Sequence, residues 1–273
     1  MPKSPVFHFF TLTFGLSWLL WSPLYFLPEA SEFWALPGAW GPTLAALILT
    51  WRSSGKAGVR TLLRKVLKGR VSVGYYVFAI VGMVVLLFLS VSIHQLLGGD
   101  SPDWGTVLEG MGLSPGKGLV AVALYPVFFL INTLIGGPIA EELGWRGFAQ
   151  EHLQQRIPPW MAGLVIGFFW AVWHLPLFLA LPQATGHMPF VAYLPVMMAM
   201  GVVFAWLYVR TGGSVLLAML LHGGMNTANG FIGTSLFADP QLLWIHVVVI
   251  VALAYLLGRD TKLRSRNSGD SEG

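Results

Sequence analysis

The chain has 273 residues, of which 55% are hydrophobic and only 10% are charged, whereas a soluble domain carries roughly 25% charged residues. This composition excludes an ordinary soluble enzyme and indicates an integral membrane protein. The absence of cysteine excludes disulfides, thiolate metal sites and a cysteine nucleophile. The net charge of +4 comes from basic residues between apolar runs, which indicate topology rather than nucleic-acid binding.

The apolar runs predict an all-α, polytopic membrane protein with about eight transmembrane helices, because each run is long enough to cross a bilayer. No repeat and no soluble second domain interrupts the series. We expect three membrane regions: an N-terminal three-span part with a basic loop, a second membrane domain, and a charged tail. The expected spans are 6–27, 33–51, 73–97, 119–135, 160–181, 191–209, 214–231 and 242–257, and the regions are 1–118, 119–257 and 258–273.

The distribution of lysine and arginine predicts the orientation of these spans, since cytoplasmic loops collect basic residues. If both termini are cytoplasmic, every lysine and arginine except Lys117 falls on the cytoplasmic side. A bacterial host would place the protein in the cell membrane. The basic segment 52–70 carries an apolar stripe and is either an interfacial helix on anionic headgroups or a solvated loop.

The fourth expected span passes through a glycine-proline break, Gly136-Gly137-Pro138, into a short polar segment, Glu141-Glu142-Leu-Gly-Trp-Arg146. Ionisable residues at membrane depth are costly and mark functional sites by default. In a helix Glu142 and Arg146 are four residues apart and share a face, so the arginine can hold that carboxylate while Glu141 points elsewhere. The alternative is a helix start with an ordinary surface salt bridge.

Two later spans each carry polar residues spaced along one helix face. Trp170 and His174 share a face of the fifth span, and His222 and Asn226 share a face of the seventh. A single histidine in an apolar helix is more often a packed residue, as we expect for His94 and His246. Two histidines, an asparagine and a carboxylate pair on three helices can satisfy each other, so we expect them to converge.

Two hydrolytic chemistries fit such a cluster. In one, a carboxylate and a histidine activate water while a histidine and an asparagine donate hydrogen bonds to an oxyanion. In the other, Glu141, His174 and His222 hold a zinc ion with one open position. The histidine spacing is not that of a known zinc motif, so we expect no cofactor and keep zinc as the alternative.

The ordered motifs Glu141-Glu142-x-x-x-Arg146, Trp170-x-x-x-His174 and His222-x-x-x-Asn226 resemble those of the CPBP family, which includes the type II CAAX prenyl endopeptidases and the Abi-type proteins. The resemblance covers about residues 119–231. One departure is Trp170, where the family usually has phenylalanine, a difference that affects packing rather than chemistry.

The resemblance implies an intramembrane endopeptidase with its catalytic domain at 119–257 and its cavity between the fourth, fifth and seventh spans. It implies that Glu141 and His174 activate water, that His222 and Asn226 stabilise the oxyanion, and that Glu142 with Arg146 supports the site. The expected partners are the bilayer and a membrane-associated peptide or lipidated protein, with no nucleic acid. The alternatives are a non-catalytic immunity or scaffolding protein of the Abi type, and a transporter, which would also contain broken helices.

Overall fold

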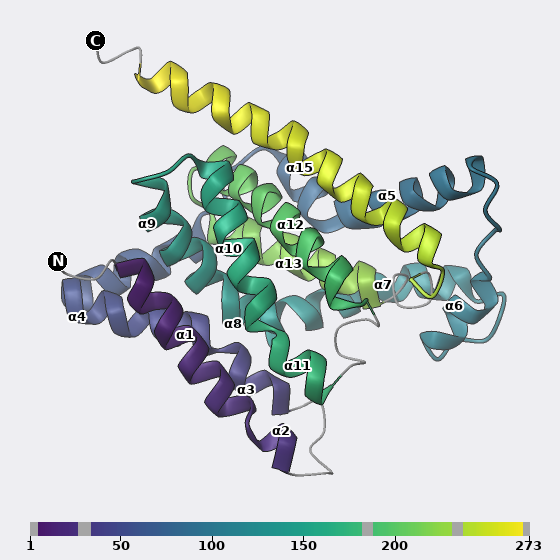
Figure 1. The fold of residues 1–273 in the computed structure, drawn as a ribbon, viewed down its shortest axis with the longest axis horizontal. Coiled ribbons are helices and arrows are strands. Elements are labelled where there is room, and N and C mark those ends of the chain that lie inside the picture. The colour runs from purple at the N-terminus through teal and green to yellow at the C-terminus, as the bar shows by residue number, and fades with distance from the viewer. Residues whose placement is uncertain (1–4, 27–33, 182–187, 231–236, 270–273) are drawn as a thin grey trace.

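A computed structural model of the chain describes residues 5–26, 34–181, 188–230 and 237–269, and these residues form helices with no strand (Figure 1). The helices are α1 (Pro5–Trp21), α2 (Pro23–Phe26), α3 (Ala35–Ala39), α4 (Gly41–Arg64), η2 (Lys65–Leu67), α5 (Val73–Leu96), α6 (Trp104–Gly110), α7 (Gly118–Ile135), α8 (Gly137–Gly144), η3 (Trp145–Gln150), α9 (Glu151–Gln154), α10 (Pro159–Trp173), α11 (Leu175–Ala180), α12 (Phe190–Arg210), α13 (Val215–Ala228) and α15 (Pro240–Gly269).

Six helical segments within these described ranges are long and apolar enough to cross a membrane, which confirms the all-α, polytopic fold class. They are Pro5–Phe26, Val73–Leu96, Gly118–Ile135, Pro159–Ala180, Phe190–Arg210 and Pro240–Asp260.

The two other expected spans look different in the structure. The second is divided between α3 and α4, and α4 continues into the basic segment, which lowers its hydropathy. The seventh corresponds to α13, which is apolar but has only 14 residues. At ~1.5 Å per residue it is about 21 Å long, shorter than the ~30 Å hydrocarbon core. The count of eight transmembrane helices stays a prediction.

The basic segment is helical through Leu67, as an interfacial helix requires, with one interruption at Gly55, where φ is 59°. Its apolar stripe is divided: Leu62 is buried in the protein, whereas Leu63 and Leu67 are exposed. Lys65 donates a 2.7 Å hydrogen bond to the Gly147 carbonyl and pairs with Glu151. Burial, and to a smaller extent Lys68, lowers the pKa of Lys65 to about 8. The basic segment is therefore bonded to η3 and α9, the two short helices that follow the glutamate pair.

Glycines allow the central helices to approach each other closely. A Cβ at Gly163 or Gly167 of α10 would clash with the backbone of α12, and one at Gly201 of α12 would clash with α10. Small residues at such crossings let membrane helices pack backbone to backbone. Figure 1 shows the result: α10, α12 and α13 lie in the middle of the bundle, with α1 and α4 along one edge.

The N-terminal helices pack directly on the short helix α8. A Cβ at Gly144 of α8 would clash with the backbone of Pro42 in α4, α3 also contacts α8, and α1 contacts α4. The first helices therefore cover the segment that carries Glu141 and Glu142. The boundaries of the three expected regions, 1–118, 119–257 and 258–273, stay predictions.

Candidate active site

The break between α7 and α8 positions the glutamate pair. Helix α7 ends at Ile135, Gly136 is extended, and α8 starts at Gly137 with Pro138 in its first turn, where proline needs no amide hydrogen. Glu141 and Glu142 then fall in the second turn of α8 and are buried, with 4% and 0% of their surface exposed. The surface-salt-bridge alternative is therefore wrong.

Glu142 accepts hydrogen bonds from two side chains. Its Oε1 accepts a 3.1 Å hydrogen bond from Arg146 Nη1 and a 2.8 Å hydrogen bond from His222 Nδ1. The arginine is four residues along the same chain segment, as expected, although the turn after Gly144 is a π-helix. The bond to His222 was not expected, and it joins α8 to α13.

Arg146 is wholly buried between two aromatic rings. Its guanidinium carbon lies 4.6 Å from the centroid of the Trp170 ring and 3.9 Å from that of Phe204. Such cation-π contacts and one carboxylate offset part of the cost of burying its charge. Arg146 is thus a buried charge inside the protein. It therefore cannot be counted among the loop residues that indicate the orientation of the spans. The cytoplasmic placement of the termini stays a prediction.

Glu141 is held by two indole groups. Its Oε2 accepts hydrogen bonds from Trp145 Nε1 at 3.2 Å and from Trp170 Nε1 at 2.8 Å. The other carboxylate oxygen, Oε1, lies beside Gly137, where an added Cβ would clash with it. One oxygen is therefore fixed by donors, and the other is directed toward the space next to Gly137.

We expect Gly137→Ala to reduce activity strongly, because the added Cβ would clash with Glu141 Oε1 and lie 3.6 Å from His222 Cε1. Gly118→Ala is the matched control: Gly118 starts α7, has no positive φ, and has nothing within 4 Å of an added Cβ. Turnover of a peptide substrate by the two variants checks this. Equal activity would show that the space beside Glu141 Oε1 is not used.

His174 lies at the end of α10 and bonds to its own helix. Its Nδ1 is 2.8 Å from the carbonyl oxygen of Trp170. A carbonyl only accepts hydrogen bonds, so this nitrogen carries the hydrogen and Nε2 of the neutral ring has the lone pair. His174 can therefore accept a hydrogen bond from water through Nε2. The ring also packs edge-on against Tyr193, at 5.6 Å between centroids.

Trp170 connects these groups. Besides its bond to Glu141, its ring centroid is 6.2 Å from that of His174 and 5.0 Å from that of His222. The aromatic residue of the second motif is thus a hydrogen-bond donor at the centre of the cluster, a function that phenylalanine could not perform. The expectation that tryptophan at this position affects only packing is therefore wrong.

Glu141, His174, His222 and Asn226 all line one cavity of about 510 Å³, in the size range of ligand pockets. The wall includes residues that the motifs did not indicate. They come from the N-terminal helices, from α7 and from α12: Trp21, Ala35, Leu36, Ala39, Asn132, Tyr193, Val196 and Met197. The four motif residues thus share a cavity, and their catalytic roles stay a prediction.

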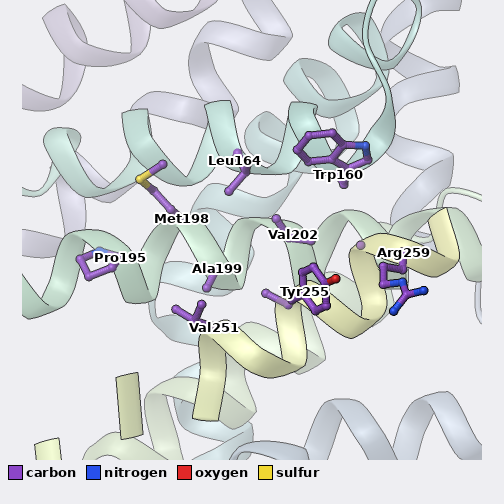
Figure 2. A pocket seen from close by; sticks show the side chains of 11 residues that line it. Trp160, Leu164, Pro195, Met198, Ala199, Val202, Val251, Tyr255 and Arg259 are labelled. Atoms are coloured by element: carbon purple, nitrogen blue, oxygen red, sulfur yellow. The ribbon is translucent and has the colours of Figure 1, made fainter. Parts of the chain in front are cut away.

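A larger furrow of about 750 Å³ lies between α10, α12 and α15, and Figure 2 shows its side chains. It is apolar apart from Trp160, Tyr255 and Arg259, and none of its lining residues is a carboxylate or a histidine. The furrow therefore lacks groups that could activate water, and the smaller cavity is the candidate active site.

Comparisons with known proteins agree with the motifs. Residues 123–228 match the family described as type II CAAX prenyl endopeptidase Rce1-like. The chain is also similar to a protein named CAAX prenyl protease 2 from Methanococcus maripaludis, with 25% identity over 268 residues that cover 91% of this chain and 92% of the relative. The resemblance stated from the ordered motifs is confirmed, and the matched residues contain Glu141, His174, His222 and Asn226.

Proposed function

We propose that this chain is an intramembrane endopeptidase of the CAAX type, in which Glu141 and His174 activate the water that attacks the scissile peptide bond. The observation that carries the proposal is the asymmetry of Glu141. One oxygen of this buried carboxylate accepts two indole hydrogen bonds, and the other lies beside Gly137 on a cavity that also contains His174, His222 and Asn226.

In the proposed reaction, the water oxygen adds to the peptide carbonyl carbon while Glu141 takes its proton. His174 Nε2 orients the same water. The C–N bond then breaks, and the proton passes to the leaving amine, which yields one new carboxylate and one new amino group. A positioned general base of this kind contributes typically a hundred- to ten-thousand-fold in rate.

The oxyanion that forms on the carbonyl needs donors. Asn226 can supply an amide hydrogen, and His222 can supply Nε2–H when its ring is protonated. The hydrogen bond between His222 Nδ1 and Glu142 Oε1 fixes the orientation of this ring, so that Nε2 is the ring nitrogen left to face the oxyanion. Glu142 thus orients His222, and Arg146 supports Glu142.

We propose that the site works without a metal ion. Within the described ranges, no three histidine, aspartate or glutamate side chains are grouped so that they could hold a metal ion. This arrangement favours the metal-independent mechanism, which we propose over zinc.

We expect a strong chelator to leave activity unchanged, and protein purified without a chelator to carry far less than one zinc per chain. Metal analysis of the active protein, together with activity before and after chelation, checks this. Activity that disappears on chelation and returns with added zinc would contradict the metal-independent mechanism.

The proposed substrate is a membrane-associated peptide: a prenylated CAAX peptide, another lipid-anchored peptide, or a peptide precursor. The name of the similar protein supports the first of these. Protein reconstituted in liposomes with a farnesylated CAAX peptide is expected to release the C-terminal fragment. A non-catalytic Abi-type scaffold would release nothing from any of the three kinds of substrate.

A further inference from the structure

Asn132 is a polar side chain that the proposed chemistry does not use. It lies on α7, one turn before the break at Gly136, and it lines the same cavity as Glu141 and Asn226. Most of α7 is apolar, so an amide at this position invites a functional explanation.

A neighbouring hydroxyl fixes the orientation of this amide. Thr227 Oγ1 donates its single hydrogen to the Gly223 carbonyl at 2.7 Å, so it can only accept from Asn132. The group 3.1 Å from Thr227 Oγ1 is accordingly the Asn132 Nδ2 amide nitrogen. The chain of bonds from Gly223 to Thr227 to Asn132 therefore determines which way the amide is turned.

This arrangement leaves half of the amide available. Asn132 Oδ1 has no hydrogen-bond partner among the residues that the structure describes, and Nδ2 has a second hydrogen. One residue of an extended peptide offers the complementary pair, because its own N–H and C=O point to the same side and can form two hydrogen bonds with a side-chain amide. Asn132 is partly exposed and lines the cavity, while Thr227, which orients it, is buried and outside the cavity wall.

We propose that Asn132 is a substrate-positioning residue that binds the backbone N–H and C=O of one residue of the extended peptide beside the scissile bond, with Thr227 holding it in the required orientation. This inference rests on the proposed function and specifies how the peptide is held. Asn226 has a different role in the proposed reaction, since its amide donates a hydrogen bond to the oxyanion. The two asparagines would fix the extended peptide from α7 and α13.

The test replaces backbone amides of the peptide by esters, one at a time, at each position except the scissile bond. An ester lacks the N–H that Asn132 Oδ1 would accept. We expect one ester position to reduce kcat/KM of the wild type about tenfold, as one lost hydrogen bond implies. Asn132→Leu is expected to lose about tenfold on the all-amide peptide, mainly through KM, and to be insensitive to that ester.

Thr227→Val is the matched variant, because it keeps the shape of the buried side chain and removes only the hydroxyl that orients Asn132. It is expected to raise KM by a smaller factor, with thermal unfolding in detergent close to that of the wild type. If Asn132→Leu loses activity but responds to the ester peptides as the wild type does, or if it loses nothing, the inference is overturned.

Binding separates this inference from the proposed function. In a Glu141→Gln background, the Kd for a fluorescent farnesylated CAAX peptide is expected to rise about tenfold when Asn132→Leu is added. If the wild type cleaves no peptide but the two Glu141→Gln proteins differ in Kd as expected, the proposed endopeptidase activity is overturned and the positioning role of Asn132 is retained. Unchanged Kd values would overturn the positioning residue whether or not cleavage occurs.

Discussion

Glu141→Gln is expected to lower hydrolysis by about ten-thousand-fold, the upper end of what one general base contributes, while the protein stays folded. The amide carbonyl of glutamine can still accept the hydrogen bonds from Trp145 and Trp170, so the buried network is retained. What disappears is the ability of the free oxygen to take a proton from water. The measurement is the rate of peptide release, with size-exclusion and thermal unfolding in detergent as checks of folding.

The other motif residues serve as graded comparisons. His174→Ala is expected to lose nearly as much as Glu141→Gln, because it removes the second contact to the water. Asn226→Ala is expected to lose about a hundred- to a thousand-fold, the usual effect of one oxyanion donor. Complete and equal loss in all three folded variants would instead indicate a shared ligand cluster.

Glu142→Ala is expected to destabilise the protein by about 3–5 kcal/mol, the usual cost of leaving a buried charge without its partner. Both Arg146 and His222 lose their acceptor, and neither can turn to solvent, since 0% and 3% of their surfaces are exposed. Glu142 is thus expected to affect folding as well as chemistry. Thermal unfolding of the purified variant in detergent measures the change.

Glu151→Ala is the control for this experiment. Glu151 also pairs with a basic residue, Lys65, but 46% of the Glu151 side chain is exposed. Only 12% of the Lys65 side chain is exposed, but Lys65 keeps its hydrogen bond to the Gly147 carbonyl, so we expect a smaller loss of stability than for Glu142→Ala. If Glu142→Ala unfolds at the same temperature as Glu151→Ala and the wild type, the buried Glu142–Arg146–His222 cluster does not support the site as we describe.

Local spacing was sufficient to predict part of the site. The Glu142–Arg146 pair follows from the four-residue periodicity of a helix, and the α7–α8 break follows from two glycines and a proline. The same rule could have found Trp145, which lies four residues after Glu141 and donates to it. Its signal was therefore present in the sequence.

Other features depend on how distant helices cross. The bond between Glu142 and His222 joins residues 80 positions apart, and the cavity wall includes Trp21 and Leu36 from the N-terminal helices. No periodicity within one segment encodes these contacts. The division of the second expected span could not be predicted for a related reason: hydropathy alone does not show that Trp40 separates α3 from α4.

Mass spectrometry of a farnesylated CAAX peptide, incubated with the protein in liposomes prepared in H₂¹⁸O, tests the central claim most directly. We predict that the wild type releases the C-terminal fragment and leaves one ¹⁸O in the new carboxylate of the farnesylated product, and that Glu141→Gln leaves the peptide intact. An uncut peptide with folded wild-type protein, or cleavage by Glu141→Gln at the wild-type rate, would contradict water activation by Glu141.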